Sequence, residues 1–241
     1  MNISVFENID EISKASGNLI VSQVIENPKC VLGLATGSTA LIPYKTMIDL
    51  YNSGAVSFKD FTTFNLDEYV GLEPENENSY HRFMNDNLFS KTDIDTDKTN
   101  FLDGLATDIE EECSEYDERI EKAGGIDIQL LGIGSDGHIA FNEPCEFFPE
   151  NTHIVELDER TIKDNSRFFN TIEEVPTKAL TMGIGSIMKS KKIILIANGK
   201  NKAEAIKKMV KGEIDPMCPS SILRLHPNVV VMLDKDAASL L

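Results

Sequence analysis

The sequence contains no tryptophan, few basic residues and no long apolar run. Its longest apolar stretches, residues 193–197 and 229–233, are far shorter than the roughly 20 residues that a membrane-spanning helix needs. No charged and apolar leader with a small-residue cleavage site opens the chain. We therefore expect a cytoplasmic protein that has no membrane partner.

Basic residues are outnumbered, with 23 Lys and Arg against 40 Asp and Glu, which gives a net charge of −17. Binding of nucleic acid requires clustered basic side chains, so this balance argues against a nucleic-acid partner. An anionic ligand would have to be held by a local positive site, built against the field of the whole protein. A helix N-terminus with a few isolated basic residues is the expected form of such a site.

Cysteine is also sparse, and the four residues Cys30, Cys113, Cys145 and Cys218 form no C-x-x-C pair. This spacing indicates neither a zinc site nor a disulfide framework. We interpret the four as reduced thiols.

The sequence alternates apolar, strand-like segments with amphipathic, helix-like segments over its whole length. Alternation of this kind predicts right-handed βαβ units and an α/β fold: a doubly wound, mostly parallel, Rossmann-like sheet with helices on both faces. We predict one catalytic domain, residues 1–241, in which the charged and poorly periodic segment 144–176 forms a lid over the active site. The expected strands are residues 30–35, 61–66, 126–133, 179–182, 192–197 and 229–233, and the expected helices are residues 10–25, 40–52, 79–88, 106–122 and 201–211.

A short polar turn, Thr36-Gly37-Ser38-Thr39, lies between a predicted strand and a predicted helix. Gly37 permits a tight turn, and the two hydroxyl side chains after it lie beside the free N–H groups of the first helical turn. Such a turn can hold a phosphate group. Taken alone, the turn is better explained as an ordinary helix cap made by Ser or Thr, because that arrangement is commoner.

Two acidic residues, Asp67 and Glu68, close the predicted strand 61–66. A carboxylate at a strand end that faces a cleft can act as a general base, particularly where burial raises its pKa. On a chain this acidic, a solvated turn is the alternative reading.

The densest group of chemically capable residues lies in segment 135–144, where Asp136 and Glu143 flank His138. A carboxylate that binds one ring nitrogen leaves the other nitrogen to exchange protons. The same three residues could form part of a metal site. We predict none, because a single histidine with two carboxylates is a loose metal signal.

The chain resembles the glucosamine-6-phosphate deaminase family, and the likeness extends over nearly its whole length. The stretches that carry it are L-A-T-G-S-T at 34–39, F-N-L-D-E-Y-V-G-L at 64–72, G-I-G-S-D-G-H-I-A-F-N-E-P at 132–144, N-S-R-F-F at 165–169 and segment 220–227. The related 6-phosphogluconolactonases share the D-G-H core but do not continue as F-N-E-P.

The resemblance implies deamination of glucosamine 6-phosphate to fructose 6-phosphate and ammonia, as a step of amino-sugar catabolism and without a cofactor. It makes Asp67 the base at C2 and C1, and His138, held by Asp136 and Glu143, the acid and base of ring opening. The phosphate would be held by Thr36, Gly37, Ser38 and Thr39 together with Arg167 and Lys202.

Three alternatives remain open at this point: a sugar-phosphate lactonase, a galactosamine-6-phosphate deaminase, and a sensor that binds a sugar phosphate without reacting. Longer members of the family carry an allosteric site with basic residues after F-N-E-P, where this chain has Val155 and Glu156. We therefore expect an unregulated enzyme, a monomer or a small homo-oligomer.

Overall fold

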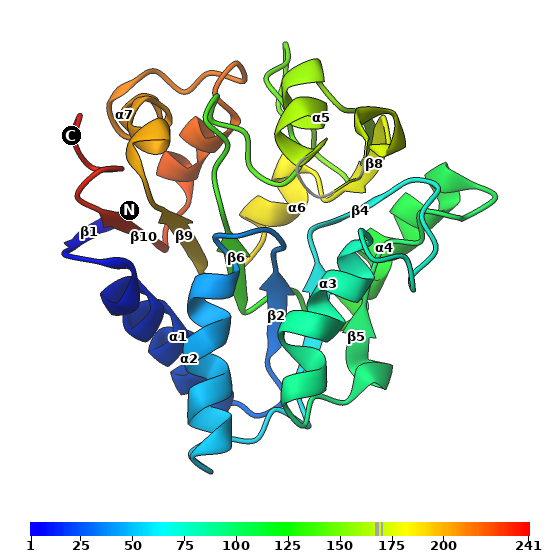
Figure 1. Ribbon diagram of the computed structural model, residues 1–241, viewed down its shortest axis with the longest axis vertical. Coiled ribbons are helices and arrows are strands. Elements are labelled where there is room, and N and C mark those ends of the chain that lie inside the picture. Colours follow the sequence, from blue (N-terminus) through cyan, green and yellow to red (C-terminus); the bar gives the residue numbers. More distant parts are fainter. Residues whose placement is uncertain (167–168, 170) are drawn as a thin grey trace.

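A seven-stranded sheet forms the centre of the computed structural model, which describes residues 1–166, 169 and 171–241 (Figure 1). The strand order is β1-β10-β9-β6-β2-β3-β5, and every neighbouring pair is parallel. The strands are β1 (Asn2–Phe6), β2 (Val31–Leu34), β3 (Thr62–Asn65), β5 (Thr99–Asn100), β6 (Ile128–Leu131), β9 (Ile193–Ala197) and β10 (Val229–Asp234).

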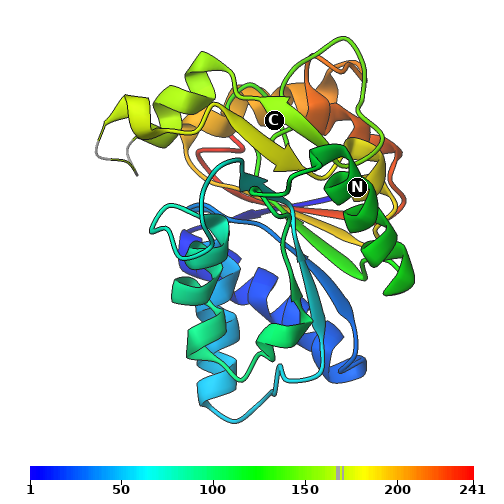
Figure 2. The ribbon, with the colours of Figure 1, turned by 90° about the vertical axis from the view of Figure 1, so that its right-hand side faces the viewer.

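Helices cover both faces of this sheet, as Figure 2 shows from the side. On one face lie α1 (Ile9–Glu26), α2 (Leu41–Asn52) and α3 (Tyr80–Asn87), and on the other lie α4 (Ile109–Lys122), α6 (Ile184–Met188) and α7 (Ala203–Lys211). The chain runs in one direction along the sheet from β2 to β5, then returns to β6 and continues through β9 to β10. Right-handed crossovers place the helices of the two directions on opposite faces. The predicted doubly wound, mostly parallel fold is confirmed.

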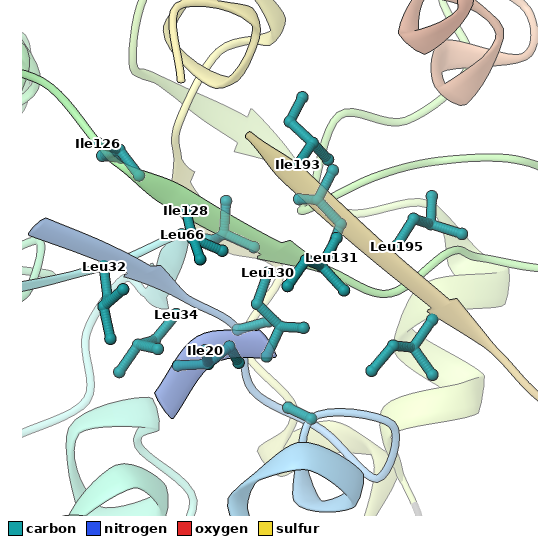
Figure 3. Packing of buried hydrophobic residues seen from close by; sticks show 14 of the residues in the cluster. Ile20, Leu32, Leu34, Leu66, Ile126, Ile128, Leu130, Leu131, Ile193 and Leu195 are labelled. Atoms are coloured by element: carbon teal, nitrogen blue, oxygen red, sulfur yellow. The ribbon is translucent and has the colours of Figure 1, made fainter. Parts of the chain in front are cut away.

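The interior of the sheet is mostly apolar, as is typical of parallel strands covered on both faces. Figure 3 shows Leu32 and Leu34 of β2 and Leu130 of β6 on the face of the sheet where Ile20 of α1 lies, while Leu195 of β9 points to the opposite face. Each of these side chains is at most 1% exposed. None of the helices in the described part of the chain is both long and apolar enough to cross a membrane.

A second, smaller sheet lies beside the carboxyl ends of the central strands. It has the order β4-β8-β7, and both of its pairs are antiparallel. Its strands are β4 (Asp67–Tyr69), β8 (Lys178–Thr181) and β7 (His153–Glu156). The helix α5 (Glu159–Asn165) follows β7 and lies next to this sheet (Figure 1).

The structure differs from the sequence prediction in several places. Residues 179–182 were expected in the parallel sheet, but β8 belongs to the smaller antiparallel one. The strands β1, β5 and β7 and the helices α5 and α6 were not predicted. The first helix, which was expected over residues 10–25, begins at Ile9 and is capped by Asn8, whose side chain accepts a hydrogen bond from the backbone N–H of Glu11 at 3.0 Å.

The predicted lid, residues 144–176, contains β7, α5 and a 3₁₀ turn, Ile172–Glu174. Its first part is tied to α4, because the carboxylate of Asp117 accepts hydrogen bonds from the backbone N–H of Thr152 at 2.8 Å and from its hydroxyl at 2.6 Å. The hydroxyl of Ser186 donates to the same carboxylate at 2.8 Å. That this segment acts as a lid, and that the chain is one domain, remain predictions.

Candidate active site

A cavity of about 280 Å³ opens where the strand order of the central sheet reverses, between β2 and β6. Loops after two adjacent parallel strands diverge at such a point and leave a crevice, which is the usual ligand site of open α/β sheets. Here the loops after β2 and β6 form two of the walls. The remaining walls come from β4, from residues 77–80 and Phe83, from α5 and from Lys202 before α7.

The turn after β2 contributes Thr36, Gly37, Ser38 and Thr39 to the cavity. Gly37 has φ 86°, a left-handed conformation that glycine adopts without strain. The residue before α2, Ala40, makes no side-chain capping hydrogen bond, so the reading of this turn as an ordinary Ser or Thr cap is wrong. Backbone N–H groups at a helix N-terminus favour an anion, which suits this wall to a phosphate group.

Asp67 contributes a buried carboxyl group to the same cavity, since its residue is only 7% exposed. Burial, which disfavours the charged form, raises the pKa of Asp67 from 3.8 to about 8, and the neighbouring charge of Glu68 raises it further in the same direction. A carboxyl group with a pKa near neutrality can both take and return a proton. The alternative of a solvated turn is wrong at this position.

Glu68 lies beside Asp67 but is held differently. Its Oε1 accepts hydrogen bonds from the backbone N–H groups of Tyr69 and Tyr80, and its Oε2 accepts one from His81, each at 2.9 Å. Burial raises the pKa of Glu68, while the three N–H donors act in the opposite direction by stabilising the carboxylate. Glu68 therefore joins β4 to the first turn of α3.

His138 follows β6 and faces the cavity, with Asp136 beside it. Nδ1 of His138 lies 2.9 Å from Oδ1 of Asp136, close enough for charge pairing, although the angle is too bent for a hydrogen bond. The same oxygen accepts a hydrogen bond from the backbone N–H of His138 at 3.1 Å. Burial alone would raise the pKa of Asp136, but the close imidazole and the backbone N–H of His138 outweigh it, and the pKa falls well below its ordinary value. Asp136 is thus kept as an anion that orients the imidazole.

Glu143 completes the group, because one ligand-type atom each from Asp136, His138 and Glu143 lies within 4.8 Å of the others. Burial is the main cause that raises the pKa of Glu143, and the hydroxyl of Thr161, which donates to its Oε1 at 2.5 Å, acts in the opposite direction. Among the described residues this is the cluster that could hold a divalent metal ion. The short Asp136–His138 contact equally suits a proton-transfer pair, and the prediction that no metal binds stays a prediction.

The loop after β6 that carries His138 has backbone positions where only glycine or a small residue fits. A Cβ atom at Gly134 would lie 2.4 Å from the ring of His138 and 2.6 Å from Oδ1 of Asp136. Gly137 has φ 103°, and Ala140 is held at φ 52°, where a side chain is strained. The loop therefore adopts strained or glycine-requiring backbone conformations that place His138 against Asp136. Such conformations are common at functional sites.

The predicted site residues occupy the following places. Thr36 to Thr39, Asp67, His138 and Lys202 line the cavity. Asp136 lies 2.9 Å from His138, and one ligand-type atom of Glu143 lies within 4.8 Å of both. Arg167 lies outside the described residues. Lys202 ends a 3₁₀ turn, Lys200–Lys202, directly before α7.

Sequence reasoning missed the aromatic part of the wall, which Tyr69, Tyr80, Phe141 and Phe169 form. The ring of Tyr69 lies 4.9 to 6.0 Å from those of the other three. Its hydroxyl also accepts a hydrogen bond from Nδ2 of Asn165, at 2.8 Å, which links β4 to α5. Residues this far apart in the sequence left no local signal of their meeting.

The fold and the site define an α/β enzyme whose cavity carries acid–base groups opposite an anion-binding turn. The chain belongs to the family of glucosamine-6-phosphate isomerases and 6-phosphogluconolactonases, whose profile matches residues 7–232.

Relatives that match over the full length of the chain are glucosamine-6-phosphate deaminases. The chain is 54% identical over 241 residues to a glucosamine-6-phosphate deaminase of Alkaliphilus oremlandii and 53% identical over 241 residues to one of Clostridium acetobutylicum, with complete coverage of both chains in each case. Among solved structures, a monomeric glucosamine-6-phosphate deaminase superposes with a TM-score of 0.97 at 44% identity, again with complete coverage of both chains.

A 6-phosphogluconolactonase of Thermotoga maritima superposes with a TM-score of 0.76 at 20% identity, over 97% of this chain and 99% of that one. At this level of identity the likeness concerns the fold alone.

Proposed function

We propose that the protein converts glucosamine 6-phosphate and water into fructose 6-phosphate and ammonia, in the breakdown of amino sugars. The observation that carries this proposal is the buried Asp67, whose raised pKa suits proton transfer, in a sugar-sized cavity that His138 and the Thr36 to Thr39 turn also line. The full-length similarity to deaminases at 52–54% identity supports the same substrate.

Ring opening is the first step. His138 gives a proton to the ring oxygen as the bond between C1 and that oxygen breaks, and the C1 hydroxyl loses its proton as C1 becomes an aldehyde. The anionic Asp136 at 2.9 Å supports the imidazolium before the transfer. Glu143 lies close enough to accept a proton in the same exchange.

Isomerisation and loss of ammonia follow. Asp67 takes the proton from C2, the electron pair forms the C1–C2 double bond, and the carbonyl π electrons move to the C1 oxygen, which takes a proton from the neighbouring ammonium group to give an enolamine. As the nitrogen lone pair forms a C2 imine, the double bond takes the proton of Asp67 back at C1. Water then adds to C2, and ammonia leaves as the C2 carbonyl forms. The cationic amine of the bound substrate favours the ionised form of Asp67, which is the form that a base requires. We propose that neither a metal nor a nucleotide takes part.

The phosphate group is assigned to the Thr36 to Thr39 turn, with Lys202, which lines the same cavity, and Arg167 as the two cations. Backbone N–H groups at the start of α2 and an ammonium group that lines the cavity support this end of the site as the anionic one. The aldehyde end of the open sugar then lies toward Asp67 and His138.

We further propose a monomeric or small homo-oligomeric enzyme without allosteric activation, located in the cytoplasm. The relative solved as a monomeric deaminase supports the first point. The free thiols of all four cysteines support a reducing compartment.

The direct test is release of ammonia from glucosamine 6-phosphate by the purified protein in the presence of a chelator. We expect ammonia and fructose 6-phosphate in equal amounts. The Asp67→Asn variant is expected to lose at least about a thousandfold in kcat, because it has no base at C2. The matched control Asp49→Asn removes an exposed carboxylate from α2 and should keep full activity.

Two further substrates separate the alternatives. Hydrolysis of 6-phosphogluconolactone needs no base at C2, so a lactonase would keep its activity in Asp67→Asn. Faster release of ammonia from galactosamine 6-phosphate would assign the other epimer. No ammonia from either amino sugar, or strict dependence on an added metal, contradicts the proposal.

A further inference from the structure

Glu68 is the buried carboxylate nearest to the proposed base that the reaction itself does not use. Along β4, Asp67 and Tyr69 line the cavity, whereas Glu68, between them, is not among the described residues that line it. Successive side chains of a strand point to opposite faces, so Glu68 points away from the substrate. It is only 4% exposed.

The carboxylate of Glu68 meets three backbone donors. The N–H groups of Tyr80 and His81 belong to the first turn of α3, where an unpaired N–H and the positive end of the helix favour an anion. The third donor is the N–H of Tyr69 on its own strand. Ser79 caps the same turn through its hydroxyl, which accepts from the N–H of Arg82 at 3.0 Å.

We propose that Glu68 is a positioning residue for the reaction, which locks the start of α3 to the strand of Asp67 and holds a fixed negative charge beside that base. This inference rests on the proposed function for the role of Asp67. Glu68 touches neither the cavity nor the substrate, so it acts entirely through its neighbours.

The hydrogen bonds between Glu68 and the first turn of α3 fix one wall of the cavity. Ser79, Tyr80 and Phe83, at and after the locked turn, line the cavity. The ring of Tyr80 lies 4.9 Å from that of Tyr69 and 6.0 Å from that of Phe141. A movement of the first turn of α3 would therefore shift an aromatic wall of the cavity that the base also lines. Misplacement of about 1 Å is enough to cost a large factor in rate.

The charge acts on the base itself. Asp67 and Glu68 are buried carboxyl groups of neighbouring residues. When one of them carries a negative charge, ionisation of the other is disfavoured. Burial raises the pKa of Glu68, but its three N–H donors stabilise the anion, and Asp67 has no such donors in the described structure, so the proton is assigned to Asp67. The other titratable groups that face this pair are Tyr69 on β4, Tyr80 and His81 on α3, Tyr116 on α4 and, around the cavity, His138, Glu77 and Lys202.

Two substitutions separate the effect of the hydrogen bonds between Glu68 and α3 from the effect of the negative charge of Glu68. Glu68→Gln keeps the length of the side chain and removes its charge, while Glu68→Asp keeps the charge and shortens the reach to α3. Glu75→Gln, which removes an exposed charge from the loop before α3, is the matched control. Each protein is assayed for ammonia release from pH 5 to 10, and the carboxyl group of Asp67 is titrated by ¹³C NMR, assigned with Asp67→Asn.

For Glu68→Gln we expect the acid limb of kcat/KM and the NMR titration of Asp67 to shift to lower pH by about half a unit or more, because a like charge is lost. For Glu68→Asp we expect kcat to fall about tenfold or more, with both pH midpoints unchanged. Glu75→Gln should match the wild type in rate and midpoints.

Three outcomes overturn the proposal: a Glu68→Gln variant whose two midpoints equal those of the wild type, a Glu68→Asp variant with wild-type kcat and KM, and failure of both variants to fold, which would make the role of Glu68 purely structural. Failure of the proposed function looks different, since the wild type would then release no ammonia. The NMR titration would still decide whether Glu68 acts on Asp67.

Discussion

At the scale of single residues, the site depends on two carboxylates that the protein treats in opposite ways. Asp136 receives a backbone N–H and the imidazole of His138, and its pKa falls. Asp67 is buried beside a like charge, and its pKa rises to about 8. One group is thus a permanent anion and the other a proton carrier, and the environment alone decides which is which.

The raised pKa of Asp67 predicts a pH-dependent cost in stability. A group whose pKa is higher in the folded state than in the unfolded chain stabilises the fold fully below its ordinary pKa, and this contribution is lost as pH rises through the folded value. The free energy of unfolding of Asp67→Asn, relative to that of the wild type, should therefore increase as pH rises from 4 to 8. The gain is about 1.4 kcal/mol per pH unit at most.

Urea denaturation of both proteins at pH 5, 6.5 and 8 measures this gain. A difference between the two proteins that stays constant over this range would show that Asp67 is not held in its protonated form.

At the scale of elements, the ends of strands carry the site, and distant segments hold those ends in place. Asp234, the last residue of β10, accepts hydrogen bonds from the backbone N–H of Gly199 at 3.1 and 2.9 Å and from that of Ala237 at 2.7 Å. Gly199 has φ 90°, and its carbonyl accepts a hydrogen bond from the N–H of Lys202 at 3.1 Å. The end of one strand therefore shapes the turn that brings Lys202 to the cavity.

We predict that Asp234→Ala weakens the binding of the sugar phosphate. Loss of the carboxylate frees the Gly199 turn and misplaces Lys202, which the mechanism uses for binding and not for chemistry. KM should rise about tenfold with kcat nearly unchanged. Steady-state kinetics measure both constants, and Asp236→Ala, an exposed neighbour on the same segment, is the control. A fall in kcat at constant KM would contradict the assigned role of Lys202.

At the scale of the whole molecule, the protein is strongly acidic and yet holds an anion. With a net charge of −17, the positive field at the phosphate must be made locally, and the proposed assignment gives this role to the start of α2, Lys202 and Arg167. Segment 151–157, where the family resemblance places the allosteric site of longer members, contains no Lys or Arg.

We therefore predict hyperbolic kinetics for the whole molecule. The rate should follow glucosamine 6-phosphate without a sigmoidal phase, and N-acetylglucosamine 6-phosphate should not activate the enzyme, because Val155 and Glu156 offer no host for a second phosphate. Initial rates with and without that compound test this prediction. Analytical ultracentrifugation gives the mass of the active species. A sigmoidal curve that becomes hyperbolic on its addition would refute the prediction.

The central sheet could be predicted from the sequence because its signals are local. Buried parallel strands such as β2, β6 and β9 are short apolar runs, and the helices between them show helical periodicity, so the alternation alone indicates the fold class. Edge strands have weaker signals. β1 lies at the sheet edge with most of its residues exposed, and β5 has only two residues, so neither was found.

For the site, the sequence by itself determined which residue types are present and that they follow strand ends, since polar turns after apolar strands are visible in one dimension. Only the tertiary structure decided what those residues become. β4 pairs with β8, about 110 residues later in the chain, and this pairing buries Asp67. Glu68 meets the N–H groups of α3 only because the two elements pack together. A pKa and a hydrogen bond depend on what surrounds a group in space, and periodicity along the chain does not carry that information.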